Sequence, residues 1–169
     1  FQTDRVDPLR LLVGHWADVS KVKWHPNNHY VLTASYDKSC RLWDIRAGGG
    51  CDCCRVYDAG APITALDVSP DGQYAAVGCD DGALYVWRLD SGKTIAKAAT
   101  GEAIYSVAFS ADAAALASGG RDTQVKIWAS VIEDGRLDVS HVFYTKSIPI
   151  FDVTWTPANL CLVSSAASL

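Results

Sequence analysis

An internal repeat with a period of about 40 residues constrains this 169-residue sequence more than any other feature. Three similar apolar runs end in tryptophan, and the tryptophans Trp43, Trp87 and Trp128 stand 44 and 41 residues apart. Each has an aspartate six residues before it, namely Asp37, Asp81 and Asp122. Self-similarity at such a period is typical of proteins in which copies of one supersecondary unit stack side by side.

Each copy has the pattern of four short β-strands joined by tight turns rich in Pro, Asp, Asn and Gly. We expect strands at 19–24, 30–35, 39–44 and 53–57, at 63–68, 74–78, 83–88 and 93–98, at 104–109, 115–119, 124–128 and 139–144, and at 150–155 and 160–164. The run 83–87, Ala-Leu-Tyr-Val-Trp, is apolar without strict alternation. Such a strand is typically covered on both faces, so the copies should pack face to face.

Four strands in about 40 to 45 residues with a terminal Trp-Asp resemble WD40 repeats, which form the blades of β-propellers. The resemblance implies an all-β fold with about three and a half blades of a seven-bladed ring. The outer strand of a preceding blade would lie in 1–13, three blades in 14–57, 58–98 and 99–144, and the start of the last blade in 145–169. The sequence contains no Met and begins with Phe1, so we expect it to be part of a longer chain.

The first copy resembles the WD40 family in a set of four polar side chains: His15, Ser35, Asp37 and Trp43. The resemblance implies that the indole N–H donates to a Ser or Thr hydroxyl and that the histidine bridges toward the aspartate. A buried donor without a partner costs about 1–3 kcal/mol, which favours a closed network. Thr33 competes with Ser35 for the hydroxyl position.

The other two copies depart from this pattern. Ala59-Gly60 and Gly101-Glu102 stand where the first copy has Gly14-His15. We therefore expect partial networks, formed by Asp81 and Trp87 in the second copy and by Ser118, Asp122 and Trp128 in the third. These blades should depend more on packing.

Residues that suggest catalysis or metal binding have simpler structural explanations. His15, Ser35 and Asp37 include the residue types of a hydrolase triad, but the blade pattern explains them and no Gly-x-Ser-x-Gly elbow occurs. The run 51–54, Cys-Asp-Cys-Cys, is interpreted as a loop and the start of an outer strand. We expect no enzyme activity, no cofactor or metal, and no small-molecule substrate.

The net charge and the hydropathy of the sequence limit the classes of partner that we expect. The formal net charge of −4 disfavours direct sequence-specific DNA binding, since nucleic-acid-binding domains often have a pI above about 9. No apolar run approaches the ~18 residues of a membrane-spanning helix, so no membrane partner is expected. Trp16, Lys21 and Lys23 are candidate contacts for a protein partner; local packing of the tryptophan and a solvated basic face are the alternatives.

Four stretches resemble a narrower family, the WD40 domain of the fifth TBP-associated factor, in its C-terminal part. They are 8–19, 24–31, 144–150 and 155–160, which include a His-Pro-Asn turn and a Thr-Lys-Ser segment. The resemblance implies a non-enzymatic nuclear scaffold of the general transcription factor TFIID. It would contact TFIID or SAGA subunits, including histone-fold TBP-associated factors, and support assembly of the RNA polymerase II preinitiation complex. The alternative is a WD40 substrate receptor of a ubiquitin ligase or a histone-tail reader.

Overall fold

The computed structural model describes residues 11–46, 52–129, 137–146 and 148–165. The regular elements of these ranges are strands: β1 (Val19–Trp24), β2 (Tyr30–Ser35), β3 (Ser39–Asp44), β4 (Asp52–Asp58), β5 (Ile63–Val68), β6 (Tyr74–Cys79), β7 (Ala83–Arg88), β8 (Thr94–Ala99), β9 (Ile104–Phe109), β10 (Ala115–Gly120), β11 (Gln124–Ala129), β12 (Asp138–Tyr144), β13 (Ile150–Trp155) and β14 (Cys161–Ser165). In this part of the chain there is no helix long and apolar enough to span a bilayer.

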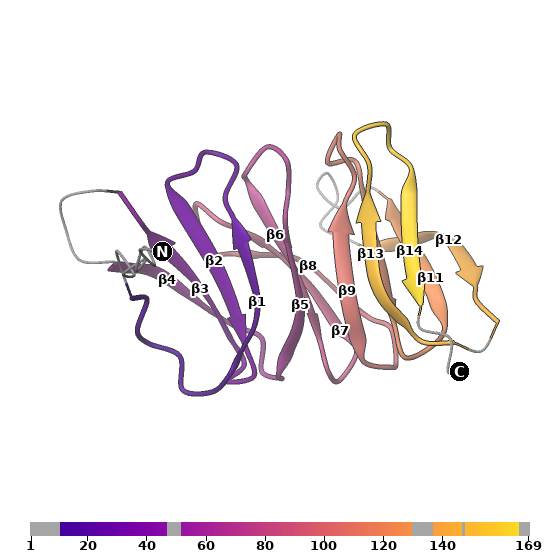
Figure 1. The fold of residues 1–169 in the computed structure, drawn as a ribbon, viewed down its shortest axis with the longest axis horizontal. Helices are drawn as coiled ribbons and strands as arrows, with labels where there is room; N and C mark the ends of the chain where they lie inside the picture. Colours follow the sequence, from indigo (N-terminus) through magenta and orange to yellow (C-terminus); the bar gives the residue numbers. More distant parts are fainter. Residues whose placement is uncertain (1–10, 47–51, 130–136, 147, 166–169) are drawn as a thin grey trace, which may run out of the picture.

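Each repeat folds into one antiparallel sheet whose strands are paired in chain order. These sheets are blade 1 (β1–β4), blade 2 (β5–β8), blade 3 (β9–β12) and the two-stranded blade 4 (β13–β14). Figure 1 shows the blades side by side, with the first strand of each blade on the near side of the array. The predicted all-β fold, with four-stranded antiparallel blades as in part of a propeller, is confirmed. We call the side formed by β1, β5, β9 and β13 the inner face.

The expected strands agree with the observed ones to within one residue at either end, with one exception. The outer strand expected before blade 1 is not formed at residues 11–13, and residues 8–10 lie outside the described residues. Leu11 and Val13 are 73% and 83% exposed. No described strand lies beside this segment to pair with its backbone N–H and C=O groups, and a strand needs such a partner.

The core lies between neighbouring blades, because each sheet is covered by the next one. All six residues of β6 are buried, as expected for a strand with no solvent-facing side. Leu32 and Leu66 belong to the cluster between blades 1 and 2, and Leu84 and Leu116 to the one between blades 2 and 3. This packing explains why inner strands are apolar runs and do not alternate with polar residues.

Hydroxyl groups on the inner strands also link neighbouring blades. Ser20 Oγ donates to the Ile63 carbonyl at 2.6 Å, and Thr64 Oγ1 donates to the Ile104 carbonyl. Ser20 and Thr64 occupy the second position of β1 and β5. The repeat thus places equivalent hydroxyls where each bridges to the next blade.

A hydrogen bond from a side chain to a backbone carbonyl joins the β1–β2 turn of blade 1 to the β5–β6 turn of blade 2. His25 Nε2 donates to the Gly72 carbonyl at 2.8 Å, and Gly72 has a φ of 73°. A Cβ at this position would lie 2.5 Å from His25 Cε1. The turn therefore needs glycine both for its left-handed backbone and for the contact with the histidine ring.

Candidate functional site

One hydrogen-bonded network joins the loop before β1 to strands β2 and β3. His15 Nδ1 lies 2.8 Å from Asp37 Oδ2, and His15 Nε2 lies 2.7 Å from Thr33 Oγ1. Trp43 Nε1 donates to the same Thr33 oxygen at 2.8 Å. The Trp43 residue is only 1% exposed, so its N–H depends on this partner.

The donors and acceptors of this network match in one arrangement. The carboxylate of Asp37 only accepts, so His15 donates from Nδ1. The Thr33 hydroxyl then donates to His15 Nε2 and accepts from Trp43. Each of these buried polar groups is satisfied, and such closed networks hold the local structure rigid.

The hydroxyl group of this network belongs to Thr33. The expectation that Ser35 accepts the indole N–H of Trp43 is therefore wrong. Ser35 Oγ instead donates to the Ala17 carbonyl at 3.2 Å and accepts from the Asp37 N–H at 3.0 Å. Trp43 pairs with Val31 across the sheet. Its indole therefore reaches the diagonal neighbour Thr33 on the same face, while Ser35 lies two residues farther along.

Asp37 fastens the loop before β1 to the β2–β3 turn. Its carboxylate accepts from the Ser39 hydroxyl at 2.6 Å, from the Ser39 N–H at 2.9 Å and from the Trp16 N–H at 3.1 Å. Burial by itself would raise the pKa of Asp37, but the hydrogen bonds from Ser39, His15 and Trp16 outweigh it and hold the pKa well below its usual range.

Acidification is expected to remove the stabilising contribution of Asp37. Because its folded-state pKa lies below the unfolded value of about 3.9, this contribution is complete above that pH and decreases as pH falls toward the folded-state pKa. The difference in thermal midpoint between the full-length protein and its Asp37→Asn variant should shrink below about pH 4. Equal differences at neutral and acidic pH would contradict this role.

Blade 3 contains part of the same network, with a lysine in contact with the turn aspartate. Trp128 Nε1 donates to Ser118 Oγ at 2.8 Å, as Trp43 does to Thr33. Lys126 Nζ donates to Asp122 Oδ2 at 2.6 Å and to the Thr100 carbonyl at 3.1 Å. Lys126 therefore holds the turn aspartate, a role that His15 has in blade 1.

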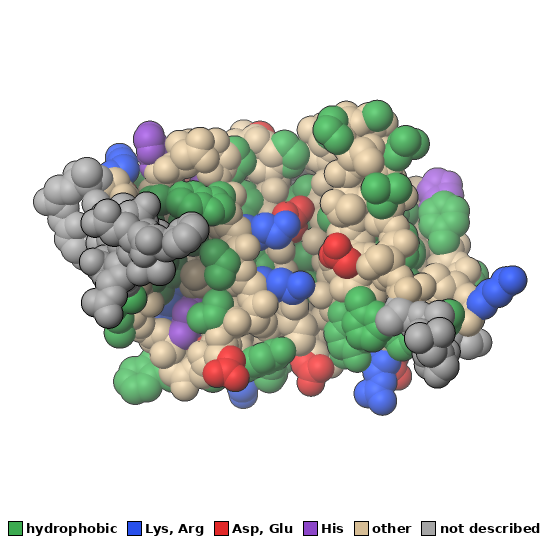
Figure 2. Space-filling view, in the orientation of Figure 1, with side chains coloured by type: hydrophobic (Ala, Val, Ile, Leu, Met, Phe, Trp, Pro, Cys, Tyr) green, Lys and Arg blue, Asp and Glu red, His purple; other side chains and the backbone are tan. Residues whose placement is uncertain are grey.

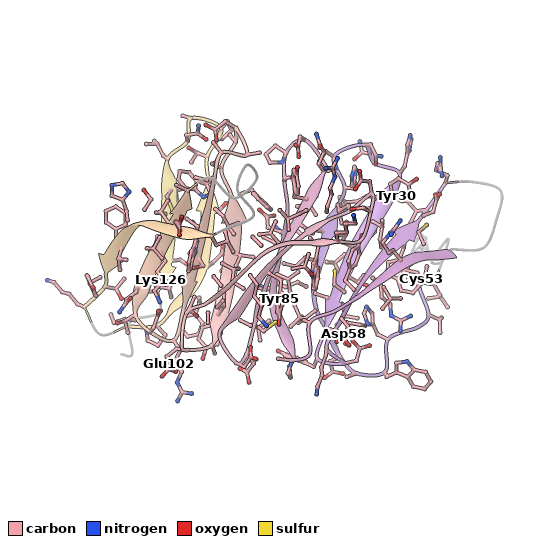
Figure 3. The ribbon with its side chains drawn as sticks, turned by 180° about the vertical axis from the view of Figure 1, so that it is seen from behind. Tyr30, Cys53, Asp58, Tyr85, Glu102 and Lys126 are labelled. Carbon is pink, nitrogen blue, oxygen red and sulfur yellow. The ribbon has the colours of Figure 1, made fainter. Side chains whose placement is uncertain are left out.

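The sequence contains signals for Thr33 in the network of blade 1 and for Lys126 in that of blade 3. Ser118 and Thr33 each stand ten residues before the tryptophan of their copy, which favours Thr33 over Ser35. Lys126, which the sequence analysis missed, stands two residues before its tryptophan, at the position of Arg41 and Tyr85 in the other copies. Figure 3 shows Lys126 and Tyr85 from behind the inner face.

Blade 2 uses aromatic packing around its tryptophan. Trp87 stacks on Tyr57 with ring centroids 5.1 Å apart and on Tyr85 with centroids 5.8 Å apart. Asp81 Oδ1 accepts the Ala83 N–H at 2.9 Å within its own turn. Val77 stands where blade 1 has Thr33 and lacks a hydroxyl, so large ring contacts stabilise this blade instead.

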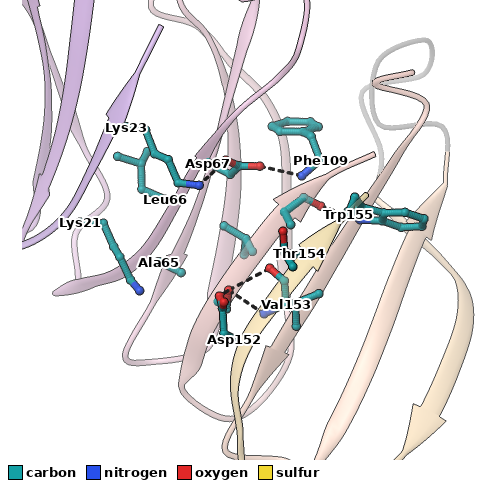
Figure 4. A pocket seen from close by; sticks show the side chains of 13 residues that line it. Lys21, Lys23, Ala65, Leu66, Asp67, Phe109, Asp152, Val153, Thr154 and Trp155 are labelled. Carbon is teal, nitrogen blue, oxygen red and sulfur yellow. Dashed lines mark hydrogen bonds and ion pairs between the residues drawn. The ribbon is translucent and has the colours of Figure 1, made fainter. Parts of the chain in front are cut away.

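Charged side chains cluster on the inner face, where blue and red groups lie close together in Figure 2. Lys23 Nζ pairs with Asp67 Oδ1 at 2.9 Å, and Asp67 Oδ2 accepts the Phe109 N–H at 2.8 Å. Ser106 Oγ donates to Asp152 Oδ1 at 2.9 Å. These groups surround a cavity of about 300 Å³ (Figure 4).

A second, larger hollow of about 550 Å³ lies beside the first. Its lining includes Lys21, the exposed ring of Tyr36, and the stacked rings of Tyr105 and Phe151. Lys21 lines both hollows. The sequence analysis selected Lys21 and Lys23 but missed the aromatic rings, because Tyr105 and Phe151 belong to different repeats.

Trp16 projects into solvent with 90% of its surface exposed. Its backbone N–H donates to Asp37, which fixes the position of the residue, while its ring lies almost wholly in solvent. This exposure disfavours local packing, one of the two explanations considered for this tryptophan. Contact with a partner stays a prediction.

Metal ligands do not gather in the described ranges, where no three His, Cys, Asp or Glu side chains are placed to hold one ion. Cys51, part of the cysteine-rich run, lies outside these ranges.

Comparison with known proteins places the repeat in a family. The family model described as "WD domain, G-beta repeat" matches residues 6–44, 51–88 and 92–129. The chain belongs to the WD40 repeat family. The matches are offset from the blades by one strand, because each ends with the third strand of a blade, β3, β7 or β11. Each match contains the tryptophan and aspartate pair described above.

Several WD40 proteins with different roles are similar to this chain. A guanine nucleotide-binding protein subunit beta of Solanum tuberosum is 35% identical over 131 residues, which cover 71% of this chain and 34% of the relative. Transcription initiation factor TFIID subunit 5 of Caenorhabditis elegans is 29% identical over 132 residues, or 76% of this chain and 20% of the relative. Small ribosomal subunit protein RACK1y of Oryza sativa subsp. japonica is 32% identical over 118 residues, or 68% and 34%. The chain thus spans about a third or less of these relatives' length.

Proposed function

We propose that this WD40 chain is a non-catalytic scaffold of a nuclear, TFIID-type transcription complex. It contributes protein-binding surface to the assembly that prepares RNA polymerase II for initiation. Its partners are TFIID subunits, among them histone-fold TBP-associated factors, or the corresponding subunits of SAGA.

The similarity to TFIID subunit 5 carries this proposal. The alignment extends over 76% of this chain, compared with 71% for the potato G-protein subunit. The resemblance in 24–31 and 144–150 points to the same family. A WD40 fold alone supports many functions, so these particular stretches are the basis for the choice.

The polar groups of the described blades support a scaffold and not a catalyst. His15, Asp37 and Thr33 have the residue types of a reactive set, yet they are hydrogen-bonded to one another in a chain that ends on the Trp43 N–H. The Lys23–Asp67 pair is likewise engaged between blades. Exposed groups such as Trp16 are suited to protein contact, since tryptophan is enriched in interface hot spots.

A second candidate is a subunit of a guanine nucleotide-binding protein. The observation that favours it is the 35% identity with the potato guanine nucleotide-binding protein subunit beta.

Affinity purification of the tagged full-length protein from its native cells distinguishes these candidates. We expect mass spectrometry to recover TBP together with histone-fold factors, or SAGA subunits without TBP. Recovery of other subunits of a guanine nucleotide-binding protein would instead support the second candidate. Cullin adaptors or histone tails without TBP would overturn both. A Leu32→Asp bait is the control for non-specific capture, because Leu32 is fully buried and a charge there should unfold the blade.

A further inference from the structure

Two opposite charges face a shared hollow on the inner face. Lys21 is the third residue of β1, and Asp152 is the third residue of β13. The same position in β5 is Ala65, which is fully buried and carries no charge. All three line the cavity of about 300 Å³, and Figure 4 shows Lys21 and Asp152 on either side of Ala65.

Neither charge is neutralised by a residue in the described part of the chain. Lys23 pairs with Asp67, whereas Lys21 makes no ion pair or hydrogen bond among the described residues. Asp152 accepts a hydrogen bond from the neutral Ser106 hydroxyl. Lys21 and Asp152 form no ion pair with each other, so both charges are available to a ligand that carries the opposite charges.

A pair of stacked aromatic side chains, Tyr105 of β9 and Phe151 of β13, lines the larger hollow that Lys21 also lines. The rings of Tyr105 and Phe151 are stacked with centroids 5.7 Å apart and an interplanar angle of 6°. Phe151 is 51% exposed, and Tyr36, which lines the same hollow of about 550 Å³, is 49% exposed. Because Lys21 lines both hollows, one continuous ligand can contact the rings and the charges together.

We propose that the inner face binds an extended peptide segment of a partner protein with three features. An acidic side chain of the segment pairs with Lys21, a basic side chain pairs with Asp152, and an apolar side chain packs on the Tyr105–Phe151 stack. The proposal deepens the scaffold function above and depends on it only in that the scaffold recruits a protein.

The charges on this face favour a peptide over nucleic acid. The carboxylates of Asp67 and Asp152 lie in the wall of the smaller hollow, and Asp80 lines the larger one. A phosphate backbone would be repelled by them. An extended peptide alternates its side chains and presents every second residue to the same surface, which suits three separate contact points.

The test is selection of a random phage-displayed peptide library on the full-length protein. We expect enriched sequences to contain an acidic, a basic and an apolar residue in close succession. Binding of the labelled consensus peptide should weaken at least about tenfold for Lys21→Glu and for Asp152→Lys, as found for paired charges at interfaces. The double variant Lys21→Asp, Asp152→Lys should prefer the peptide with its two charges exchanged.

Matched controls separate recognition from folding. Lys93→Glu and Asp138→Lys change equally charged, exposed residues outside both hollows and should leave binding unchanged. Asp152→Asn keeps an acceptor for Ser106 and should still weaken binding, with an unaltered thermal midpoint. Absence of enriched peptides, enriched peptides without the charge pair, or equal binding by Lys21→Glu and Lys93→Glu would overturn the proposal.

The peptide selection and the affinity purification can fail independently of each other. Recovery of TFIID or SAGA subunits by the full-length bait, with no selected peptides, would remove this binding site and leave the scaffold function. Selected peptides with the charge dependence above, but no such subunits in the purification, would retain the site and exclude the transcription complex.

Discussion

Replacing Trp43 by alanine is expected to lower the free energy of unfolding by about 3–5 kcal/mol, the usual cost of removing a large buried aromatic side chain. Trp43 is 1% exposed and lies within blade 1. The change leaves a cavity and deprives the Thr33 hydroxyl of the N–H that it accepts. Chemical denaturation of the full-length protein measures the effect.

Two further variants separate the ring of Trp43 from its N–H group. Trp43→Phe keeps most of the packing but removes the donor, so about 1–2 kcal/mol should be lost. Trp16→Ala removes a tryptophan that is 90% exposed, and a change within about 0.5 kcal/mol is expected. If Trp43→Ala and Trp16→Ala had similar effects, the described network would not be a source of stability.

Replacing Gly120 by alanine is expected to cost about 3 kcal/mol, at the upper end for overpacking a core. An added Cβ would lie 2.0 Å from the Ala103 carbonyl oxygen, which is a backbone atom and cannot rotate away. The same carbonyl accepts the Arg121 N–H at 2.9 Å. Relief of the contact would therefore shift the start of β9 or break that hydrogen bond.

Gly101→Ala is the matched control for this prediction. Gly101 has a φ of 89°, and a Cβ there would meet no atom within 4 Å. Its alanine variant should lose only the cost of a left-handed backbone, about 1–2 kcal/mol. The thermal midpoints of the Gly101→Ala and Gly120→Ala variants compare the backbone cost with the steric cost. A larger decrease in the midpoint for Gly101→Ala would refute the steric explanation at Gly120.

The repeat predicted the strands well because both of its signals are local. Polar turns such as 69–72 mark where the chain reverses, and apolar runs such as 83–87 mark strands covered on both faces. β-pairing within a blade joins segments that follow each other directly, so the observed β5 to β8 differ from the expected strands by one residue at most.

The hydrogen-bonded network could be predicted only in part. Its members His15, Asp37 and Trp43 were visible in the sequence, but Thr33 and Ser35 were both open for the hydroxyl. Cross-strand register decides between them, since Trp43 lies opposite Val31 and reaches Thr33 on the diagonal. Lys126 escaped notice because a lysine replaces histidine in contact with Asp122, and a residue-by-residue match to the first copy does not find it.

The sequence by itself determined the blade: its four strands, its turns and the tryptophan that each copy buries. Only the tertiary structure decided what the inner face presents. Lys21 and Asp152 belong to different repeats, and no local pattern relates their charges. They share one hollow because the blades pack with their first strands on one side, and side chains far apart in the chain meet wherever that packing places equivalent strand positions together.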